Sequence, residues 1–309
     1  MSRLDDLLEE VAQIQADTLL ELTHSSIERL RDERRRGYCG ENRVKSGLVT
    51  FLRKGDLLVV GDLHGDYESL KGILIQSKIM PKLGMNSSIL FLGDYGDRGD
   101  YSPEVYFTVL RLKSEFPHSV FLLRGNHEGP QDLLAVPHDL PYQLQGRYGH
   151  QGKKAYQCLI ELFDVLYHAA IIPGKYLLVH GGIPSEARSL DEIALADVTH
   201  PQTSYLEEIL WSDPRDEIQG IAPSLRGAGK FFGPDLTEIT LKLLNVKTLI
   251  RGHEAFVEGY SVHHQGKILT LFSCSGPPYN IPHATYLLFE IDNTSFNAYD
   301  LAKRVRTIE

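Results

Sequence analysis

Short apolar runs that end in small or polar residues recur along the chain after Gly37. Residues 57–60, 89–92 and 120–123 are such runs, each rich in Val, Ile, Leu or Phe. Helical spacing of apolar residues follows the first two runs, and this order predicts β-loop-α units. Strands that are apolar throughout predict a sheet covered on both faces. We therefore expect an α/β fold that binds its ligands at the carboxyl ends of the strands.

The second half of the chain repeats this pattern less regularly. Residues 176–179 and 248–250 are apolar runs that lead into polar residues. Residues 260–264, 268–274 and 285–291 predict neighbouring antiparallel strands, the first two joined by a turn at Gln265 and Gly266. Because candidate site residues come from both halves, we expect two sheets of one domain to contribute to a single site.

The N-terminal region has a different pattern. Residues 2–35 predict a helix, because apolar residues recur at three-to-four spacing and no Pro or Gly interrupts them. A partner-binding or coiled-coil role is the alternative, but the repeat fades after about two heptads. We expect residues 1–36 to pack on a main domain formed by residues 37–309. The basic run at residues 31–36 is interpreted as a solvated helix end.

Composition narrows the class of protein. The chain has 309 residues, of which 42% are hydrophobic, and this is typical of a folded globular protein. Its net charge of −9 disfavours nucleic-acid binding, which depends on clustered Lys and Arg. The three cysteines show no CxxC spacing. The N-terminus does not resemble a secretory signal and no apolar run is long enough to span a membrane, so we expect a cytoplasmic protein without membrane contact.

Polar residues of metal-ligand type stand where the predicted strands end. Carboxylate, amide and imidazole donors without thiolates suit Mn, Fe or Zn and would not suit Ca. One such loop would be a weak signal, but five consecutive strand ends carry these residues, and glycines between them allow sharp turns. All the polar residues at these strand ends, with Arg98 among them, are Asp62, His64, Asp94, Asp97, Arg98, Asn126, His127, His180 and His253.

Five sequence blocks resemble a known family. They are Gly61-Asp-Leu-His-Gly65, Gly93-Asp-Tyr-Gly-Asp-Arg-Gly99, Arg124-Gly-Asn-His-Glu128, His180-Gly-Gly182 and Arg251-Gly-His253. In content and order they are similar to the signature blocks of the PPP-type serine/threonine phosphoprotein phosphatases. The resemblance covers about residues 57–275. It implies a metallophosphoesterase-type β-sandwich of two mixed sheets flanked by helices, with the active site at the carboxyl ends of the strands.

The resemblance also implies roles for the site residues. Asp62 and His64 would bind one divalent metal ion, Asp94 would bridge both ions, and the ligands of the second ion would be Asn126, His180 and His253. A hydroxide between the ions would attack phosphorus in line with the leaving group. Manganese is the favoured metal, with iron, zinc or cobalt as alternatives.

The remaining polar residues would handle the leaving group and the phosphate. In the family pattern His127 is the general acid and Asp97 orients it. Arg98 and Arg226 would clamp the phosphoryl oxygens, because a guanidinium matches them with two donors. Arg226 belongs to one of two further pieces, with Trp211, that are typical of the protein-phosphatase branch.

The implied function is hydrolysis of phosphoserine and phosphothreonine in proteins, with regulatory proteins as further partners. Two alternatives remain open. A dinucleoside polyphosphate or nucleotide hydrolase is disfavoured by the Trp211 and Arg226 pieces. A scaffold protein whose catalysis has lapsed is disfavoured because neither a ligand nor the acid is missing.

The chain departs from the family pattern at several positions. Gly96 stands where a β-branched residue is usual, and Gly252 and Glu254 stand where eukaryotic members have Ala and Gln. Residues 131–148 also differ in sequence from eukaryotic members, and these differences suggest a prokaryotic or archaeal-type member. A longer loop before Tyr279 leaves open whether this residue lines the site, and Cys274 is interpreted as a small buried residue.

Overall fold

The computed structural model describes residues 3–292 and 295–308. Residues 1 and 2 of the predicted helical segment and residue 309 of the predicted main domain therefore lie outside the described residues. The α-helices are α1 (Arg3–Val11), α2 (Ala16–Arg36), α3 (Tyr67–Ser77), α4 (Ser102–Glu115), α5 (Leu140–Tyr148), α6 (His150–Phe163), α7 (Leu190–Ala194), α8 (Ala196–Thr199), α9 (Tyr205–Trp211), α10 (Pro234–Leu243) and α11 (Ala298–Ala302). Short 3-10 turns are η1 (Met80–Lys82), η2 (Gln131–Leu133) and η3 (His264–Gly266).

The strands form two large mixed sheets and one small sheet. The eight-stranded sheet has the order β1 (Tyr38–Cys39), β2 (Asn42–Lys45), β3 (Leu48–Thr50), β7 (Ala169–Ile172), β8 (Tyr176–Val179), β12 (Thr248–Arg251), β14 (Ile268–Leu271) and β13 (Tyr260–His263). The five-stranded sheet has the order β16 (Val305–Thr307), β15 (Thr285–Ile291), β4 (Gly55–Val60), β5 (Ser87–Phe91) and β6 (Val120–Leu122). The small sheet has the order β10 (Ile221–Pro223), β11 (Lys230–Phe232) and β9 (Asp213–Pro214).

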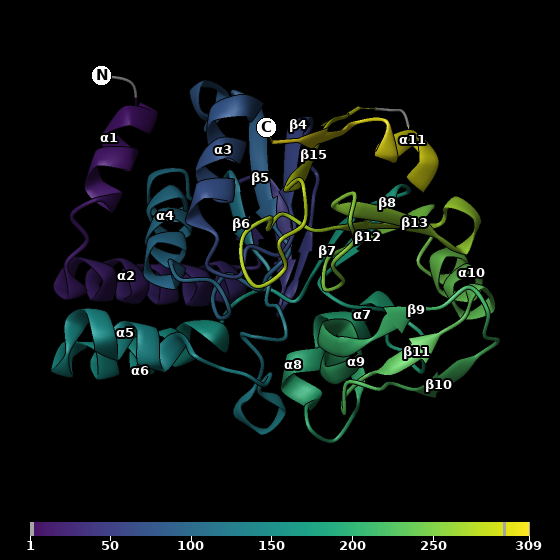
Figure 1. Ribbon diagram of the computed structural model, residues 1–309. Coiled ribbons are helices and arrows are strands. Elements are labelled where there is room, and N and C mark those ends of the chain that lie inside the picture. Colours follow the sequence, from purple (N-terminus) through teal and green to yellow (C-terminus); the bar gives the residue numbers. More distant parts are fainter. Residues whose placement is uncertain (1–2, 293–294, 309) are drawn as a thin grey trace.

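The two large sheets share one apolar core. Leu58 and Leu90 of the five-stranded sheet belong to the same buried cluster as Leu178 and Leu269 of the eight-stranded sheet. Helices α3 and α4 cover the five-stranded sheet, and α7, α9 and α10 lie on the side of the eight-stranded sheet (Figure 1). The predicted α/β sandwich of two mixed sheets flanked by helices is confirmed.

Parallel strands bring the predicted loops to one edge. β4, β5 and β6 run parallel, and β8, β12 and β14 run parallel in the other sheet. An isolated bridge of Asp62 with Phe272 joins the sheets where β4 and β14 end. Since parallel strands end at the same edge, the polar loops of both sheets meet there.

The strand at residues 285–291 does not lie where the sequence predicted it. β13 and β14 pair antiparallel, as expected, but β15 pairs antiparallel with β4 in the other sheet. Six residue pairs, from Tyr286–Val60 to Ile291–Gly55, form this ladder. A strand's own residues specify which faces are apolar but not which partner it joins, and this is why the prediction was wrong.

The predicted N-terminal helix is two helices. α1 ends at Val11 and α2 begins at Ala16, with a turn in which the Gln13 amide donates to the Glu10 carbonyl. Ile14 in this turn is buried. The break allows α1 to contact α3 and α4 and allows α2 to contact α4 and α6. Because both segments keep three-to-four spacing, apolar periodicity alone did not reveal the break.

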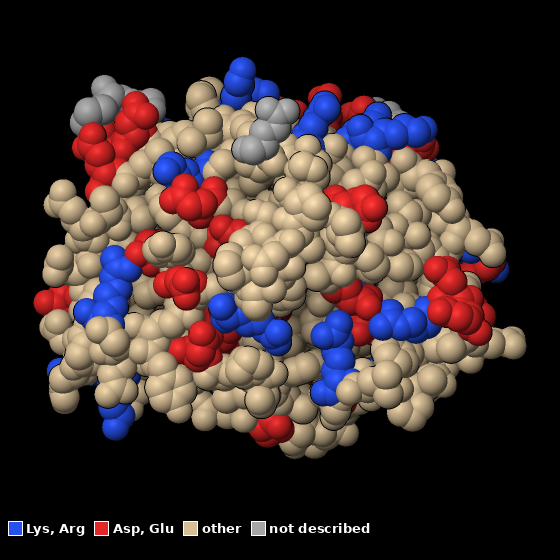
Figure 2. All heavy atoms as spheres, in the orientation of Figure 1, with Lys and Arg blue, Asp and Glu red and all other residues tan. Residues whose placement is uncertain are grey.

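The outer surface carries charges of both signs. On the face in Figure 2, Lys and Arg side chains lie in small groups beside Asp and Glu side chains. Within residues 3–292 and 295–308, no helix combines the length and the apolar character that crossing a membrane requires.

Candidate metal centre and active site

A pocket of about 420 Å³ opens at the edge where the two large sheets meet. Seven of the predicted site residues line it, and Asp62, Asp97 and His180 are buried beneath them. The pocket is lined by His64, Asp94, Arg98, Asn126, His127, Leu134, Ala135, Val136, Trp211, Arg226, His253, Ala255 and Tyr279.

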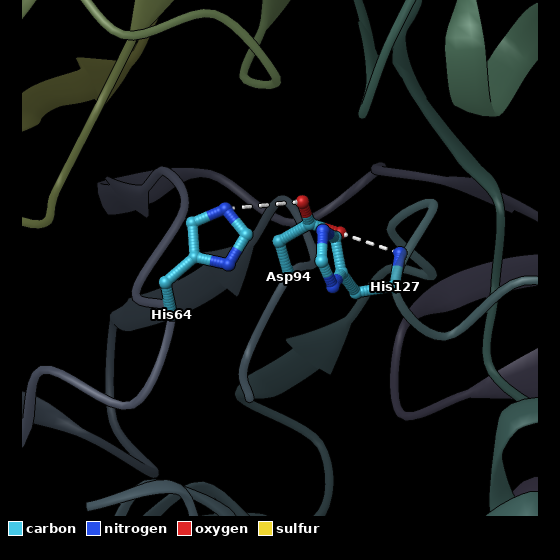
Figure 3. Close-up of side chains that lie close together, drawn as sticks. All are labelled: His64, Asp94 and His127. Carbon is cyan, nitrogen blue, oxygen red and sulfur yellow. Dashed lines mark hydrogen bonds and ion pairs between the residues drawn. The ribbon is translucent and has the colours of Figure 1, made fainter. Parts of the chain in front are cut away.

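Asp94 lies at the centre of the site. In Figure 3 its carboxylate stands between the His64 ring and the backbone nitrogen of His127. Oδ2 of Asp94 lies 3.4 Å from Nε2 of His64, and this nitrogen is 3.7 Å from Oδ2 of Asp62. These three atoms, from the loops after β4 and β5, form the first group of candidate ligands.

A second group lies on the other side of Asp94. Oδ1 of Asp94 is 3.5 Å from Nε2 of His180, which follows β8. The side-chain oxygen of Asn126 is 3.0 Å from this Nε2 and 3.0 Å from Nδ1 of His253, and the two ring nitrogens are 3.1 Å apart. Both sheets therefore contribute atoms to this group, and Asp94 belongs to both groups.

Backbone carbonyls orient two of the histidines. Nδ1 of His180 is 3.0 Å from the Leu92 carbonyl, and Nδ1 of His64 is 3.2 Å from the Gly96 carbonyl. A carbonyl only accepts hydrogen bonds, so both Nδ1 atoms carry the proton and both Nε2 atoms point a lone pair into the site. Metal-binding histidines are commonly held in this way.

The inward-facing atoms fit cations. Oδ2 of Asp62 is buried and has no hydrogen-bond partner, and the Asn126 oxygen faces the lone pair of His180. Burial raises the pKa of Asp62 to about 7 and raises the pKa of Asp94 well above its usual range. Burial also lowers the pKa of His180 well below its usual range, so its ring is neutral. Divalent cations would satisfy these converging acceptors and would stabilise the charged carboxylates that burial alone disfavours.

His127 and Asp97 form a close pair. Nδ1 of His127 is 2.6 Å from Oδ2 of Asp97, whose side chain is 1% exposed. Burial raises the pKa of Asp97. The hydrogen bonds and charges of two histidines lower this pKa by more than burial raises it, so the net pKa lies well below the usual range. Nε2 of His127 is left to face the pocket, 3.3 Å from a terminal nitrogen of Arg98.

The two predicted arginines approach the pocket from different sheets. Arg98 follows β5, and its buried Nε has no hydrogen-bond partner. Arg226 lies in the turn that joins β10 to β11, where Nε donates to Oδ2 of Asp213 at 2.7 Å. Asp213 also accepts from the buried Arg251 at 2.8 Å. Thus Asp213 fixes Arg226 at the rim, and the small sheet, which the sequence did not predict, places both.

Tyr279 is among the pocket-lining residues. Its ring centroid is 5.2 Å from that of His64 and 4.7 Å from that of Phe272. Burial raises the pKa of Tyr279. Cys274, in the same loop, is a buried free cysteine, as expected.

Two glycines are required where the backbone passes close to ligands. A Cβ on Gly125 would lie 2.1 Å from Oδ1 of Asp94, and a Cβ on Gly252 would lie 2.4 Å from Oδ1 of Asp62. Gly96 has a different reason: a Cβ there would lie 2.8 Å from the Tyr106 ring, which fills the space behind the loop.

Glu128 supports the site, although the sequence argument assigned it no role. Its buried carboxylate accepts from the backbone nitrogens of Asp94, Tyr95 and Gly125 and from the Tyr106 hydroxyl, at 2.8–3.1 Å. A Glu directly after two candidate site residues, in a segment without helical spacing, is the signal that could have identified it.

Comparison with known proteins places the chain in a family. A family model described as calcineurin-like phosphoesterase matches residues 55–256, more than half of the chain. Serine/threonine-protein phosphatase 6 catalytic subunit from Caenorhabditis elegans is 33% identical over 239 residues, which cover 77% of this chain and 70% of the relative. Serine/threonine-protein phosphatase SIT4 from Candida albicans is 34% identical over 218 residues, covering 70% and 68%.

Other relatives are longer. A probable serine/threonine-protein phosphatase from Encephalitozoon cuniculi is 37% identical over 71% of this chain, which spans 47% of that relative. A solved structure of a protein serine/threonine phosphatase from Saccharomyces cerevisiae, with similarity to human phosphatase PP5, has the same fold: the TM-score is 0.76 at 23% identity, covering 100% of this chain and 96% of the other. The chain therefore belongs to the calcineurin-like phosphoesterase family, and its relatives include serine/threonine-protein phosphatases.

Proposed function

We propose that this protein hydrolyses phosphate monoesters on serine and threonine side chains of other proteins. The observation that carries the proposal is the convergence of six ligand-type side chains, around Asp94, on a pocket that also holds His127 and two arginines. The relatives named serine/threonine-protein phosphatases support the same substrate class.

The residues that would hold the cations follow from the two groups around Asp94. Asp62, His64 and Asp94 would bind one ion, and Asp94, Asn126, His180 and His253 would bind the other. Bound divalent cations would neutralise charge on the phosphoryl oxygens. They would also lower the pKa of a water molecule, so that it loses a proton near neutral pH and can attack phosphorus. We propose manganese, with iron, zinc or cobalt as alternatives, because donors of this kind accept all four.

His127 would protonate the leaving oxygen. A serine or threonine alkoxide is a poor leaving group, so a proton donor on its side lowers the barrier. Because Nδ1 is bonded to Asp97, the pocket-facing Nε2 is the atom that would deliver the proton. Arg98 and Arg226 would bind the phosphoryl oxygens and hold the ester in line for attack.

The differences from eukaryotic family members bear on the origin of the protein. Gly96, Gly252, Glu254 and residues 131–148 support a prokaryotic or archaeal-type member of the family. We also propose a cytoplasmic location, phosphoprotein substrates whose choice involves regulatory proteins, and a division into a helical segment at residues 1–36 and a catalytic domain at residues 37–309.

Phosphate release from defined substrates tests the function. The purified protein, loaded with Mn²⁺ and analysed for bound metal, is incubated with a phosphoserine peptide, a phosphothreonine peptide and diadenosine tetraphosphate. We expect turnover of both peptides and little of the dinucleotide. Asp94→Asn is the control for contaminating activity, because it removes the carboxylate that belongs to both ligand groups.

Each alternative has its own outcome in this experiment. Preferential cleavage of diadenosine tetraphosphate would assign the site to a dinucleotide hydrolase. A sample with bound metal that leaves every substrate intact would favour a protein whose catalysis has lapsed.

A further inference from the structure

Asp97 accepts a hydrogen bond from a second histidine, His138, in addition to the one from His127. Nδ1 of His138 lies 2.7 Å from Oδ2 of Asp97, the oxygen that His127 also contacts at 2.6 Å. The other oxygen, Oδ1, accepts from the backbone nitrogens of Asp139 and Leu140 at 2.9 and 2.7 Å. Three of these four donors come from residues 138–140, so one short segment holds the carboxylate that orients His127.

His138 is itself held from behind. Its Nε2 is 2.7 Å from the Tyr156 hydroxyl on α6, and its side chain is 13% exposed. Leu134, Ala135 and Val136 of the same loop line the pocket, whereas His138 is not one of the described residues that line it. His138 therefore contacts Asp97 from outside the pocket lining, between this carboxylate and Tyr156.

The spacing of these atoms indicates hydrogen bonds rather than a third metal site. Two ligands of a tetrahedral zinc ion, each about 2.0 Å from the metal, lie roughly 3.3 Å apart. The contacts of Asp97 with His127 and His138 are shorter, at 2.6 and 2.7 Å, which is the length of a charge-assisted hydrogen bond. The corresponding contacts of Asp94 with His64 and His180 are 3.4 and 3.5 Å.

We propose that His138 is a positioning residue that, supported by Tyr156, holds Asp97 in the orientation that aims His127 at the leaving oxygen. The backbone nitrogens of Asp139 and Leu140 hold Oδ1 and the two histidines hold Oδ2, so loss of the His138 donor would leave Oδ2 freer to move by rotation about χ2 together with the His127 ring. The donor from His138 opposes that rotation. This inference rests on the proposed function, since it assigns His138 to the same general-acid step.

The electrostatics agree with a donating His138. Burial lowers the pKa of His138, but the hydrogen bond that it donates to Asp97 and the negative charge of Asp97 raise this pKa by more, so the net pKa lies above its usual value. His138 also belongs to residues 131–148, the stretch that differs in sequence from eukaryotic family members.

A comparison of two substrates tests the proposal. A phosphoserine peptide needs a proton for its leaving group, whereas 4-nitrophenyl phosphate has a good leaving group and gains little from an acid. In His138→Leu we expect kcat for the peptide to fall roughly tenfold, part of the ~10²–10⁴-fold that a general acid contributes. We expect kcat for the aryl ester to stay within about twofold.

Three further variants complete the design. His138→Asn keeps an amide donor near the position of Nδ1, so it should recover most of the peptide activity. Tyr156→Phe removes only the contact behind His138 and should give a smaller loss with the same substrate preference. His150→Leu, at an exposed histidine on α6, is the matched control and should change neither rate. An equal loss with both substrates, or no loss with either, would overturn the proposal.

A measurement without turnover separates this proposal from the proposed function. In the zinc-loaded protein, the NMR signal of the proton shared by His127 Nδ1 and Asp97 should move in His138→Leu and stay unchanged in His150→Leu. A signal that does not move would overturn the positioning role, even if the enzyme is active. A wild-type protein that cleaves neither substrate would instead contradict the proposed function.

Discussion

Several residues of the site have a backbone conformation that residues other than glycine rarely adopt. Their φ angles are positive: His64 (44°), Asp94 (55°), Asp97 (65°), Arg98 (74°) and His253 (73°). Each such residue costs on the order of 1–3 kcal/mol and persists only where its surroundings hold it. Here backbone nitrogens of Leu63 and His64 both donate to the Asp94 carbonyl, and Glu128 accepts from the Asp94 nitrogen.

Glu128→Gln tests how far this carboxylate supports the loop that carries Asp94. Each oxygen of its carboxylate accepts two hydrogen bonds, so the amide nitrogen of Glu128→Gln would face two donors in either orientation. We expect the free energy of unfolding to fall by about 1–3 kcal/mol. Metal affinity should fall roughly 10–100-fold, because the loops that carry the ligands lose their support. Urea unfolding and metal titration measure both, with Glu9→Gln at the surface as the control.

His127→Asn tests the general acid. We expect kcat for a phosphoserine peptide to fall about 10²–10⁴-fold, while bound metal stays the same, because this side chain is assigned to the leaving group and not to the cations. Steady-state kinetics and metal analysis of one sample measure both quantities. An unchanged rate would remove His127 from the mechanism.

At the scale of elements, α2 joins parts of the fold that are distant in the sequence. Lys113 of α4 is fully buried and donates to Glu33 of α2 at 2.9 Å. The basic run at the end of α2 is only partly solvated, because Arg34 is 16% exposed and bonds Asp197 of α8 at 2.5 Å. The interpretation of this run as a solvated helix end therefore fails at Arg34 and is confirmed at Arg31, Arg35 and Arg36, which are exposed.

The contact of α2 with α8 predicts a pH dependence of stability. Burial raises the pKa of Asp197, but His168 and Arg34 lower it by more, so the folded pKa lies below that of the unfolded chain. The stability that Asp197 contributes is thus present above the unfolded pKa of about 4 and is lost as the pH falls through the folded pKa. The wild type should exceed Asp197→Asn in stability near neutral pH, and the difference should shrink in acid.

Urea unfolding across this pH range measures that difference. Asp191→Asn is the matched control, because Asp191 forms a surface pair with Lys45 in which both side chains are more than half exposed. Such pairs contribute little. A difference that stays constant in acid would contradict the assignment to Asp197.

At the scale of the whole molecule, the stability of the fold depends on cations bound where the two large sheets meet. Acceptor atoms from the β4, β5 and β6 loops meet acceptor atoms from the β8 and β12 loops, and buried acceptors that face one another are unfavourable unless cations lie between them. Binding of a ligand to the folded state alone raises stability, by about 2.7 kcal/mol at 100 times its Kd.

Removal of metal should therefore lower the melting temperature. We expect two ions per chain in the protein as loaded, a lower Tm after treatment with a chelator, and recovery of Tm when Mn²⁺ or Zn²⁺ is returned. Differential scanning calorimetry and elemental analysis measure these quantities. His180→Ala should bind less metal and show a smaller response, and equal Tm values with and without chelator would contradict the cation assignment.

The sequence by itself determined the parts of this protein that depend on local order. Apolar runs followed by small or polar residues identified β4, β5, β6, β8 and β12, and the blocks after them contain the residues that the structure gathers around Asp94. Strand ends are readable because a strand is a short local pattern, and because parallel strands deliver their loops to one edge.

Only the tertiary structure decided features that rest on distant partners. The partner of β15, the break before α2, the support of Asp94 by Glu128 and the contact of His138 with Asp97 all join segments that local patterns treat separately. His138 and Asp97 are 41 residues apart, and Tyr156 lies on a further helix. Such contacts depend on how sheets and helices pack, and periodicity along the chain carries no record of which surfaces meet.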